Sequence, residues 1–286
     1  MKEYRGLIVL GVATVVILLP FFIFVAAGWP GKPNSCIDER PDGCFCEHFE
    51  RRDVLNGAPG VRQSTNTWFN LYAIFTALIV ASVVTYDRKQ YGETDAPNLI
   101  SSRSWMPDLY IFAVLFLGLG SMWFHASLKA WGGTLDGMSM FVYASFLIFY
   151  SVRRLWNNAL FFWIAYLGTI ALNTALHGRV DSLYLILLLV AGYLGVEIAI
   201  WVKTKKPFGG SVATGILWWL AVAAIIAATV FWKLSKTGGP LCDPFSAKQP
   251  HGLLWHPLAG VMAVLLYFYW RLADEPVSIQ SGLDEL

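Results

Sequence analysis

Three polar side chains stand at the junction of two long apolar runs: Ser121, His125 and Asp136. Ser121 and His125 are four residues apart, so on a helix they share one face. Gly132 and Gly133 suit a tight reversal of the chain, which would make Asp136 open the next helix and point back toward His125. Burying polar groups in an apolar segment costs free energy unless they are satisfied or used, so we expect a functional site here.

Two further histidines, His251 and His256, stand at the beginning of the last apolar run. Together with His125 they make three imidazoles, the number of protein ligands in a catalytic zinc site that leaves its fourth position to water. The alternative is that these side chains only cap and anchor helix ends at a membrane interface. The set of residues predicts zinc as the cofactor if the fold brings the three rings together.

The elements that must position these residues are membrane-spanning helices. Of the 286 residues, 56% are hydrophobic and 14% are charged, and the mean hydropathy of +0.54 is too high for an ordinary soluble domain. A helix needs about 20 apolar residues to cross a bilayer. The runs that qualify lie roughly at 7–27, 66–86, 107–127, 134–152, 156–176, 180–202, 212–232 and 251–271. The sequence therefore predicts an all-α polytopic membrane helix bundle.

The distribution of lysine and arginine predicts the orientation of these spans. Lys2 and Arg5 precede the first run, and with the N-terminus in the cytoplasm the other cytoplasmic loops are also basic. The first run is longer than a signal-peptide core, which favours an uncleaved anchor over a cleaved signal. This topology places Ser121, His125 and Asp136 at one depth with the two later histidines, on the non-cytoplasmic side. The net charge of +2 is uninformative about nucleic acid, but the sequence has no basic stripe interleaved with aromatic residues, so we do not expect nucleic acid as a partner.

The domain organisation follows from these spans. Residues 1–30 form an anchor helix, 31–65 an outer loop with cysteines, 66–272 the remaining seven helices, and 273–286 a polar cytoplasmic tail. The loops within the helical part are compact, which favours a bacterial inner membrane over an endomembrane for this multi-pass protein.

The cysteines all fall in predicted outer loops, three in the first loop and one in the last: Cys36, Cys44, Cys46 and Cys242. An even number of cysteines on an oxidising side favours disulfides. A zinc cluster is the alternative, but Cys-x-Cys lacks the usual ligand spacing. The compartment does not by itself assign the pairs.

Three features occur together in this sequence: Ser-x-x-x-His, an aspartate eleven residues later, and a final helix that begins with His251 and Trp255-His256. This combination resembles the alkaline ceramidase family. That family belongs to a wider group of seven-helix membrane hydrolases that includes the adiponectin receptors. The resemblance runs from about Phe45 to Tyr269, so that residues 66–272 correspond to the seven helices of the family and the first span is an addition.

The resemblance implies a zinc-dependent amidase that cleaves ceramide into sphingosine and a fatty acid. It implies that His125, His251 and His256 bind the zinc, that Ser121 stabilises the oxyanion, and that Asp136 handles the proton of the attacking water. It also implies a disulfide between Cys46 and Cys242, which would leave Cys36 to pair with Cys44.

Two departures from the family affect these expectations. The last two histidines are five residues apart instead of four, about 140° around a regular helix. Because Pro257 loosens the turn before it, we expect an irregular turn or a π-bulge between His251 and Pro257. The family also binds calcium before its first helix. Here Glu47 remains, but Gln63 replaces an expected glutamate, so few hard oxygen ligands are left for calcium.

These observations lead to two hypotheses about function. The first is an intramembrane hydrolase acting on the carbon–nitrogen bond of a lipid amide, ceramide or a related N-acyl lipid, drawn from the bilayer. The second is a heptahelical membrane receptor or scaffold with a structural zinc site. Ser121 and Asp136 favour the enzyme, because a closed structural site needs neither residue. A protein partner is not predicted from the sequence.

Overall fold

The computed structural model describes residues 2–38, 45–91 and 96–274, and within these ranges the chain is helical without a β-strand. The same ranges contain eight helical segments long and apolar enough to cross a membrane, as predicted. These segments are α1 (Arg5–Ala27), α4 with α5 (Ser64–Phe69 and Tyr72–Gln90), α6 (Met106–Ser127), α7 (Ala130–Leu155), α8 (Ala159–Leu176), α9 (Ser182–Thr204), α10 (Val212–Leu234), and the π-helix η3 with α11 (His251–Trp255 and His256–Leu272). The short elements are η1 (Lys2–Tyr4), α2 (Ser35–Asp38), α3 (Arg51–Asn56) and η2 (Pro207–Gly210).

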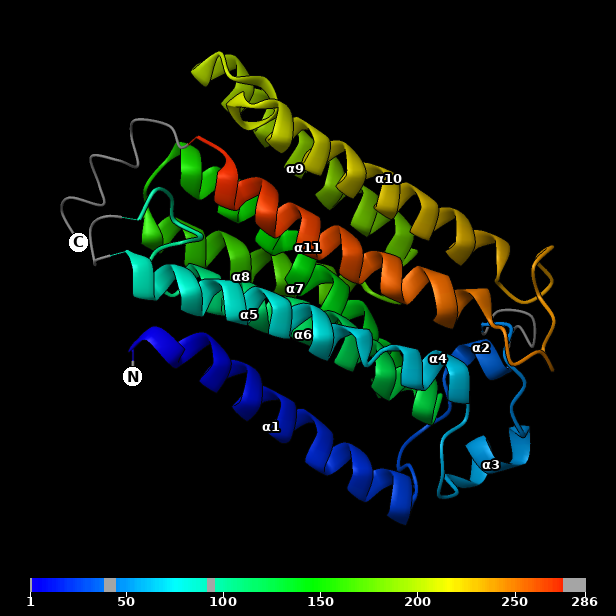
Figure 1. Ribbon diagram of the computed structural model, residues 1–286. Helices are drawn as coiled ribbons and strands as arrows, with labels where there is room; N and C mark the ends of the chain where they lie inside the picture. The colour runs from blue at the N-terminus through cyan, green and yellow to red at the C-terminus, as the bar shows by residue number, and fades with distance from the viewer. Residues whose placement is uncertain (1, 39–44, 92–95, 275–286) are drawn as a thin grey trace.

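The helices form one bundle in which α6 is the most buried span. Helix α1 lies along one side of the bundle and contacts α5 and α6, whereas α9 and α10 lie on the opposite side (Figure 1). Helix α1 begins and α11 ends at the same end of the bundle (Figure 1). The other end, which we call the α4 end, carries α2, α3, α4 and the beginning of α11 (Figure 1).

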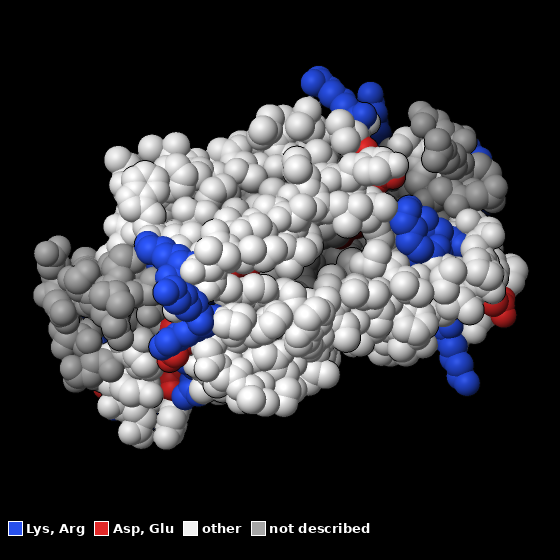
Figure 2. All heavy atoms as spheres, turned by 90° about the horizontal axis from the view of Figure 1, so that it is seen from above, with Lys and Arg blue, Asp and Glu red and all other residues white. Residues whose placement is uncertain are grey.

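The charged side chains lie mainly toward the two ends of the bundle. Figure 2 shows a broad band between them that is almost free of lysine, arginine, aspartate and glutamate. Many large apolar side chains on the spans are exposed, for example Val16, Ile164 and Leu188. Because a hydrocarbon environment disfavours charge and accepts such side chains, the protein is an integral membrane protein.

The reversal between α6 and α7 does not lie at Gly132 and Gly133, so that prediction was wrong. The chain turns at Leu128, whose φ is 51°, and both glycines are helical residues of α7. Asp136 therefore lies in the second turn of α7 and does not open the helix. A Cβ on Gly132 would come 2.7 Å from Oγ of Ser127. The glycine is required for the close approach of the two helices and not for a turn.

The second span is interrupted between α4 and α5, which the sequence did not indicate. At the junction the amide of Leu71 donates to the carbonyl of Trp68 at 3.1 Å, and the amide of Ile74 donates to that of Leu71 at 3.0 Å. Bonds between residues three apart tighten the helix locally. The side-chain amide of Asn70 also donates to the carbonyl of Asn66 at 2.7 Å. The short helix α4 thereby becomes a separate element that covers one end of the bundle.

Helix α1 is tied to the bundle by a charged contact at the end opposite α4. Arg5 donates to Asp108 of α6 at 2.7 Å, and the fully buried Arg88 of α5 donates to both oxygens of the same carboxylate at 2.8 and 2.9 Å. One carboxylate therefore connects three spans, which anchors the N-terminal helix.

A second buried charge, Glu197 of α9, connects α7, α9 and α11. Its carboxylate accepts hydrogen bonds from Ser151 at 2.6 Å, Arg154 at 2.9 Å and Tyr269 at 2.8 Å. Both Glu197 and Arg154 are 0% exposed. A buried ion pair is sustained only when hydrogen bonds also satisfy its remaining atoms. These contacts give Glu197 a structural role in joining the three helices.

Candidate metal centre

Three histidines meet at the α4 end of the bundle. His125 belongs to the last turn of α6, His251 begins η3, and His256 begins α11. All three side chains are buried, and one nitrogen from each lies within 4.8 Å of the other two. The centroid of the His251 ring is 4.7 Å from that of His256 and 5.1 Å from that of His125. The fold thus brings together the histidines that the sequence singled out.

The spacing of His251 and His256 is accommodated by a π turn, which confirms the predicted irregularity. Residues His251–Trp255 form a π-helix, and the amide of His256 donates to the carbonyl of His251, five residues back. A π turn contains one residue more than an α turn, so residues five apart take the places that residues four apart have in a regular helix. Pro257 follows directly and has no amide hydrogen that could continue the regular pattern.

The nitrogens of this cluster fit a metal ion. Nε2 of His125 and Nδ1 of His251 are buried and have no hydrogen-bond partner among the described residues. Leaving a buried polar atom unsatisfied costs about 1–3 kcal/mol, whereas coordination would satisfy each nitrogen. Neutral imidazole nitrogens are common ligands of zinc and other divalent transition metals. The three histidines could therefore hold such an ion.

Ser121 lies one helical turn from this cluster, and Asp136 of α7 is connected to the cluster through Ser121. Ser121 is buried one turn before His125 on α6, and its side chain interacts with the Asp136 carboxylate. Tyr72 of α5, to which sequence reasoning gave no role, lies near both parts of the site. Its ring is nearly parallel to that of His256 at a centroid distance of 6.2 Å, and its hydroxyl interacts electrostatically with Asp136.

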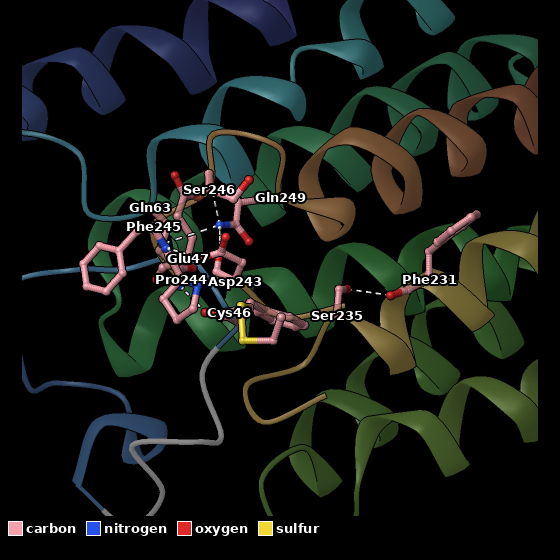
Figure 3. Close-up of a disulfide and its surroundings, with 12 residues drawn as sticks. Cys46, Glu47, Gln63, Phe231, Ser235, Asp243, Pro244, Phe245, Ser246 and Gln249 are labelled. Atoms are coloured by element: carbon pink, nitrogen blue, oxygen red, sulfur yellow. Dashed lines mark hydrogen bonds between the residues drawn. A yellow bond between two sulfur atoms is a disulfide. The ribbon is translucent and has the colours of Figure 1, made fainter. Parts of the chain in front are cut away.

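The cysteine prediction is confirmed for one pair. Cys46 and Cys242 form a disulfide that joins the first loop to the segment before α11 (Figure 3). Cys36 is also disulfide-bonded, while Cys44 and the predicted tail at 275–286 lie outside the described residues. The disulfide holds the residues on either side of Cys46 close to the histidines. One of them is Phe45, whose ring is stacked on that of His251 with the centroids 3.8 Å apart.

Glu47, the one acidic residue that we considered as a calcium ligand, caps helix α4. Its two carboxylate oxygens accept the backbone amides of Thr65 at 2.6 Å and Asn66 at 2.8 Å. A carboxylate at a helix N-terminus satisfies orphan donors and complements the helix dipole. Gln63 lies next to Glu47 (Figure 3), and its side-chain amide contacts His125 on one side and two backbone carbonyls on the other.

Helix α4 also presents polar atoms that have no partner within the described chain. Both side-chain atoms of Asn66, the hydroxyl of Thr67 and Oδ1 of Asn70 are buried without a hydrogen bond, and Nδ2 of Asn70 lies 3.3 Å from Nε2 of His256. Sequence reasoning gave these residues no role, although polar residues at positions i, i+1 and i+4 before an apolar run were a usable signal. They add hydrogen-bonding capacity to the wall of the site.

An apolar cavity of about 290 Å³ lies between α6, α7, α9, α10 and α11. Its lining includes Leu117, one turn before Ser121, and Met140, one turn after Asp136. Trp255, the residue before His256, also lines it. The cavity therefore begins about one helical turn from the polar residues, and its volume is near the lower end of about 300–1,000 Å³ for ligand pockets.

Comparison with known proteins does not assign this chain to a family: no protein-family model matches it, and no curated protein matches it.

Proposed function

We propose that this protein is a zinc-dependent intramembrane amidase that hydrolyses ceramide or a related N-acyl lipid to a fatty acid and a long-chain amine. The observation that carries the proposal is the cluster of three buried histidines near an apolar cavity, with Ser121 one helical turn from His125 and interacting with Asp136. The resemblance of the sequence to alkaline ceramidases supports the same activity.

The number of ligands supports a catalytic and not a structural site. Within the described residues the candidate group contains three histidines and no fourth histidine, cysteine or carboxylate. Structural zinc sites have four protein ligands, whereas catalytic sites have three and leave one position open. When bound, zinc supplies a lowered pKa for water and polarisation of a carbonyl group.

The side chains of Asp136 and Ser121 would carry the remaining chemistry. Asp136 accepts a proton as water adds to the amide carbon, and it returns that proton to the nitrogen as the carbon–nitrogen bond breaks. Ser121 donates a hydrogen bond to the negative charge that develops on the carbonyl oxygen. The products are a carboxylic acid and an amine, so the atoms of water are fully accounted for.

The apolar cavity would hold an alkyl chain of the lipid while the polar wall of α4 faces its head. We place this site on the non-cytoplasmic side of the membrane, from the distribution of lysine and arginine, and favour a bacterial inner membrane.

The test is mass spectrometry of lipid products after incubating the purified protein with a panel of N-acyl lipids, with and without a zinc chelator. Asp136→Asn should keep the metal and lower turnover about 10²–10⁴-fold, and Ser121→Ala should lower it about 10²–10³-fold. Asp274→Asn is the control, because Asp274 pairs with the exposed Lys206 at the end of the bundle where α11 ends, opposite α4. Unchanged hydrolysis in both site variants would favour a receptor or scaffold instead, and purified protein without zinc would reject the zinc amidase.

A further inference from the structure

We propose that Gln63 is a positioning residue that fixes the ring of His125 and couples it to the segment anchored by the Cys46–Cys242 disulfide. The proposal rests on the proposed function only in taking the three histidines to be metal ligands. It does not require that the lipid be a ceramide or that the protein be an enzyme.

The orientation of the Gln63 side-chain amide is determined by its neighbours. Nε2 of Gln63 lies 2.7 Å from the backbone oxygen of Phe45 and 3.1 Å from that of Glu47. Both of these oxygens can only accept, so the nitrogen must face them. The amide oxygen Oε1 consequently faces Nδ1 of His125 at 2.7 Å. Gln63 is 0% exposed, so water does not compete for these contacts.

The orientation of the amide in turn determines the tautomer of His125. Because Oε1 of Gln63 only accepts, Nδ1 of His125 must carry the hydrogen and donate it. The lone pair then resides on Nε2, the buried atom that has no partner in the described chain. The backbone amide of Gln63 also donates to the carbonyl of His125 at 3.1 Å. Residue 63 therefore holds both the ring and the backbone of a candidate ligand.

The nitrogen of the Gln63 side-chain amide contacts the segment that the disulfide anchors (Figure 3). Phe45 and Glu47, whose carbonyls accept the Gln63 amide, are the two neighbours of Cys46 in the chain. Beyond the disulfide, the amide of His48 donates to the carbonyl of Pro244 at 2.9 Å, so the segment is paired with the loop that leads to α11. One glutamine thus connects the disulfide, and through it the start of α11, to the ligand on α6.

This connection matters for metal binding because the partner of a ligand histidine sets its tautomer, its orientation and its basicity. Loss of such a partner typically lowers metal affinity about 10–100-fold. We therefore expect the affinity for zinc to depend on Gln63 and on the disulfide together. If Gln63 only filled space, replacing it would lower the stability of the fold, but its effect on zinc affinity would not depend on the disulfide.

Two substitutions separate the functions of the two ends of the amide. Gln63→Met keeps the approximate size of the side chain but removes both the acceptor and the donor, so zinc affinity should fall about 10–100-fold and the disulfide should be reduced faster. Gln63→Glu keeps an acceptor for Nδ1 of His125 but cannot donate to the two carbonyls. It should retain the wild-type affinity for zinc while its disulfide is reduced faster than in the wild type.

The measurements are zinc competition against a chromophoric chelator and the rate of disulfide reduction, both on the full chain in detergent. Lys129→Met is the matched control. Lys129, between α6 and α7, is buried and donates to the carbonyl of Val54 in the first loop at 2.7 Å. It should change neither quantity, and thermal unfolding of each variant checks that it is folded.

A double-mutant cycle tests the coupling directly. Replacing both Cys46 and Cys242 by serine should lower zinc affinity. A variant that combines this replacement with Gln63→Met should lose much less affinity than the product of the two separate losses, because groups in one network are not additive. Wild-type affinity in Gln63→Met, unchanged disulfide reduction in both Gln63 variants, or fully multiplicative effects would each overturn the proposal. If the wild-type protein binds no zinc, both this proposal and the proposed function are wrong. If it binds zinc and the variants change zinc affinity and disulfide reduction as expected, but no amide is hydrolysed, only the proposed function is rejected.

Discussion

The ring of Phe45 is stacked on the ring of His251, with 3.8 Å between the centroids and 22° between the planes. The same ring lies 5.1 Å from that of His125, so Phe45 covers two of the three candidate ligands. Because Phe45 directly precedes Cys46, its position depends on the disulfide. The first loop is therefore part of the candidate site, although it lies outside the membrane spans.

Phe45→Ala should make bound zinc easier to remove. The substitution opens the side of the cluster that the ring covers, so we expect a chelator to extract zinc at least about 10-fold faster, comparable to losing a partner of a metal ligand. Phe245→Ala is the control, because Phe245 is an aromatic residue of the last loop that is 80% exposed. Equal extraction rates in the two variants would show that Phe45 does not shield the metal.

Gly252→Ala should destabilise the contact between η3 and α4. A Cβ at this position would lie 3.0 Å from Oδ1 of Asn66 and 3.0 Å from the carbonyl of Thr65. Overpacking of this kind costs about 1–3 kcal/mol, and it should also weaken zinc binding because it displaces the start of α11. Gly168→Ala, with no atom within 4 Å of the new Cβ, should leave the thermal unfolding temperature and zinc affinity unchanged. A Gly252→Ala variant with the same unfolding temperature and zinc affinity as Gly168→Ala would contradict this prediction.

Calcium should not be required for zinc binding or for lipid hydrolysis. Both oxygens of Glu47 already accept backbone amides of α4, and the neutral amide of Gln63 occupies the space between the carbonyls of Phe45 and Glu47. Calcium needs six to eight oxygen ligands. We expect the same zinc affinity and the same turnover in EGTA and in millimolar calcium, and a strong stimulation by calcium would refute this prediction.

Glu197→Leu should destabilise the bundle, because it removes the carboxylate that balances the buried charge of Arg154. Breaking a buried ion pair on one side costs about 3–5 kcal/mol. Adding Arg154→Met should restore part of the stability, since the pair is then replaced by apolar groups. Unfolding in detergent, followed by circular dichroism, measures both variants. A double variant less stable than the single one would indicate that the two residues are not coupled.

Labelling of introduced cysteines should place the last loop and the C-terminal tail on opposite sides of the membrane. Lys248→Cys lies in the loop before α11, on the side that we assign as non-cytoplasmic, and Asp284→Cys lies after the last span. An impermeant maleimide added to intact cells should label position 248 and not position 284. The opposite result would invert the topology and put the histidines at the cytoplasmic side.

The spans and the π turn could be predicted from the sequence because both are local. A helix that crosses a bilayer requires about 20 apolar residues in succession, and such a run is visible without knowledge of its neighbours. The distortion at His251 could be predicted because five-residue spacing on one face is incompatible with a regular helix, and Pro257 removes a donor in the same turn.

The role of Gly132 and Gly133 could not be predicted from the local sequence. A glycine pair is equally suited to a turn and to the close packing of two helices, and only the position of Ser127 against Gly132 distinguishes the two. The break between α4 and α5 was missed for the same reason, since a single polar residue such as Asn70 near the start of a span does not by itself indicate an interruption of the helix.

The sequence by itself determined that eight apolar helices form and that three histidines, a serine and an aspartate lie near span ends, because residue type and spacing express those properties. Only the tertiary structure decided what surrounds them. Gln63 and His125 are 62 positions apart in the chain, and the Cys46–Cys242 bond spans 196. Contacts at such separations depend on how helices pack in three dimensions, and no periodicity along the chain encodes which side chain will lie against a given nitrogen.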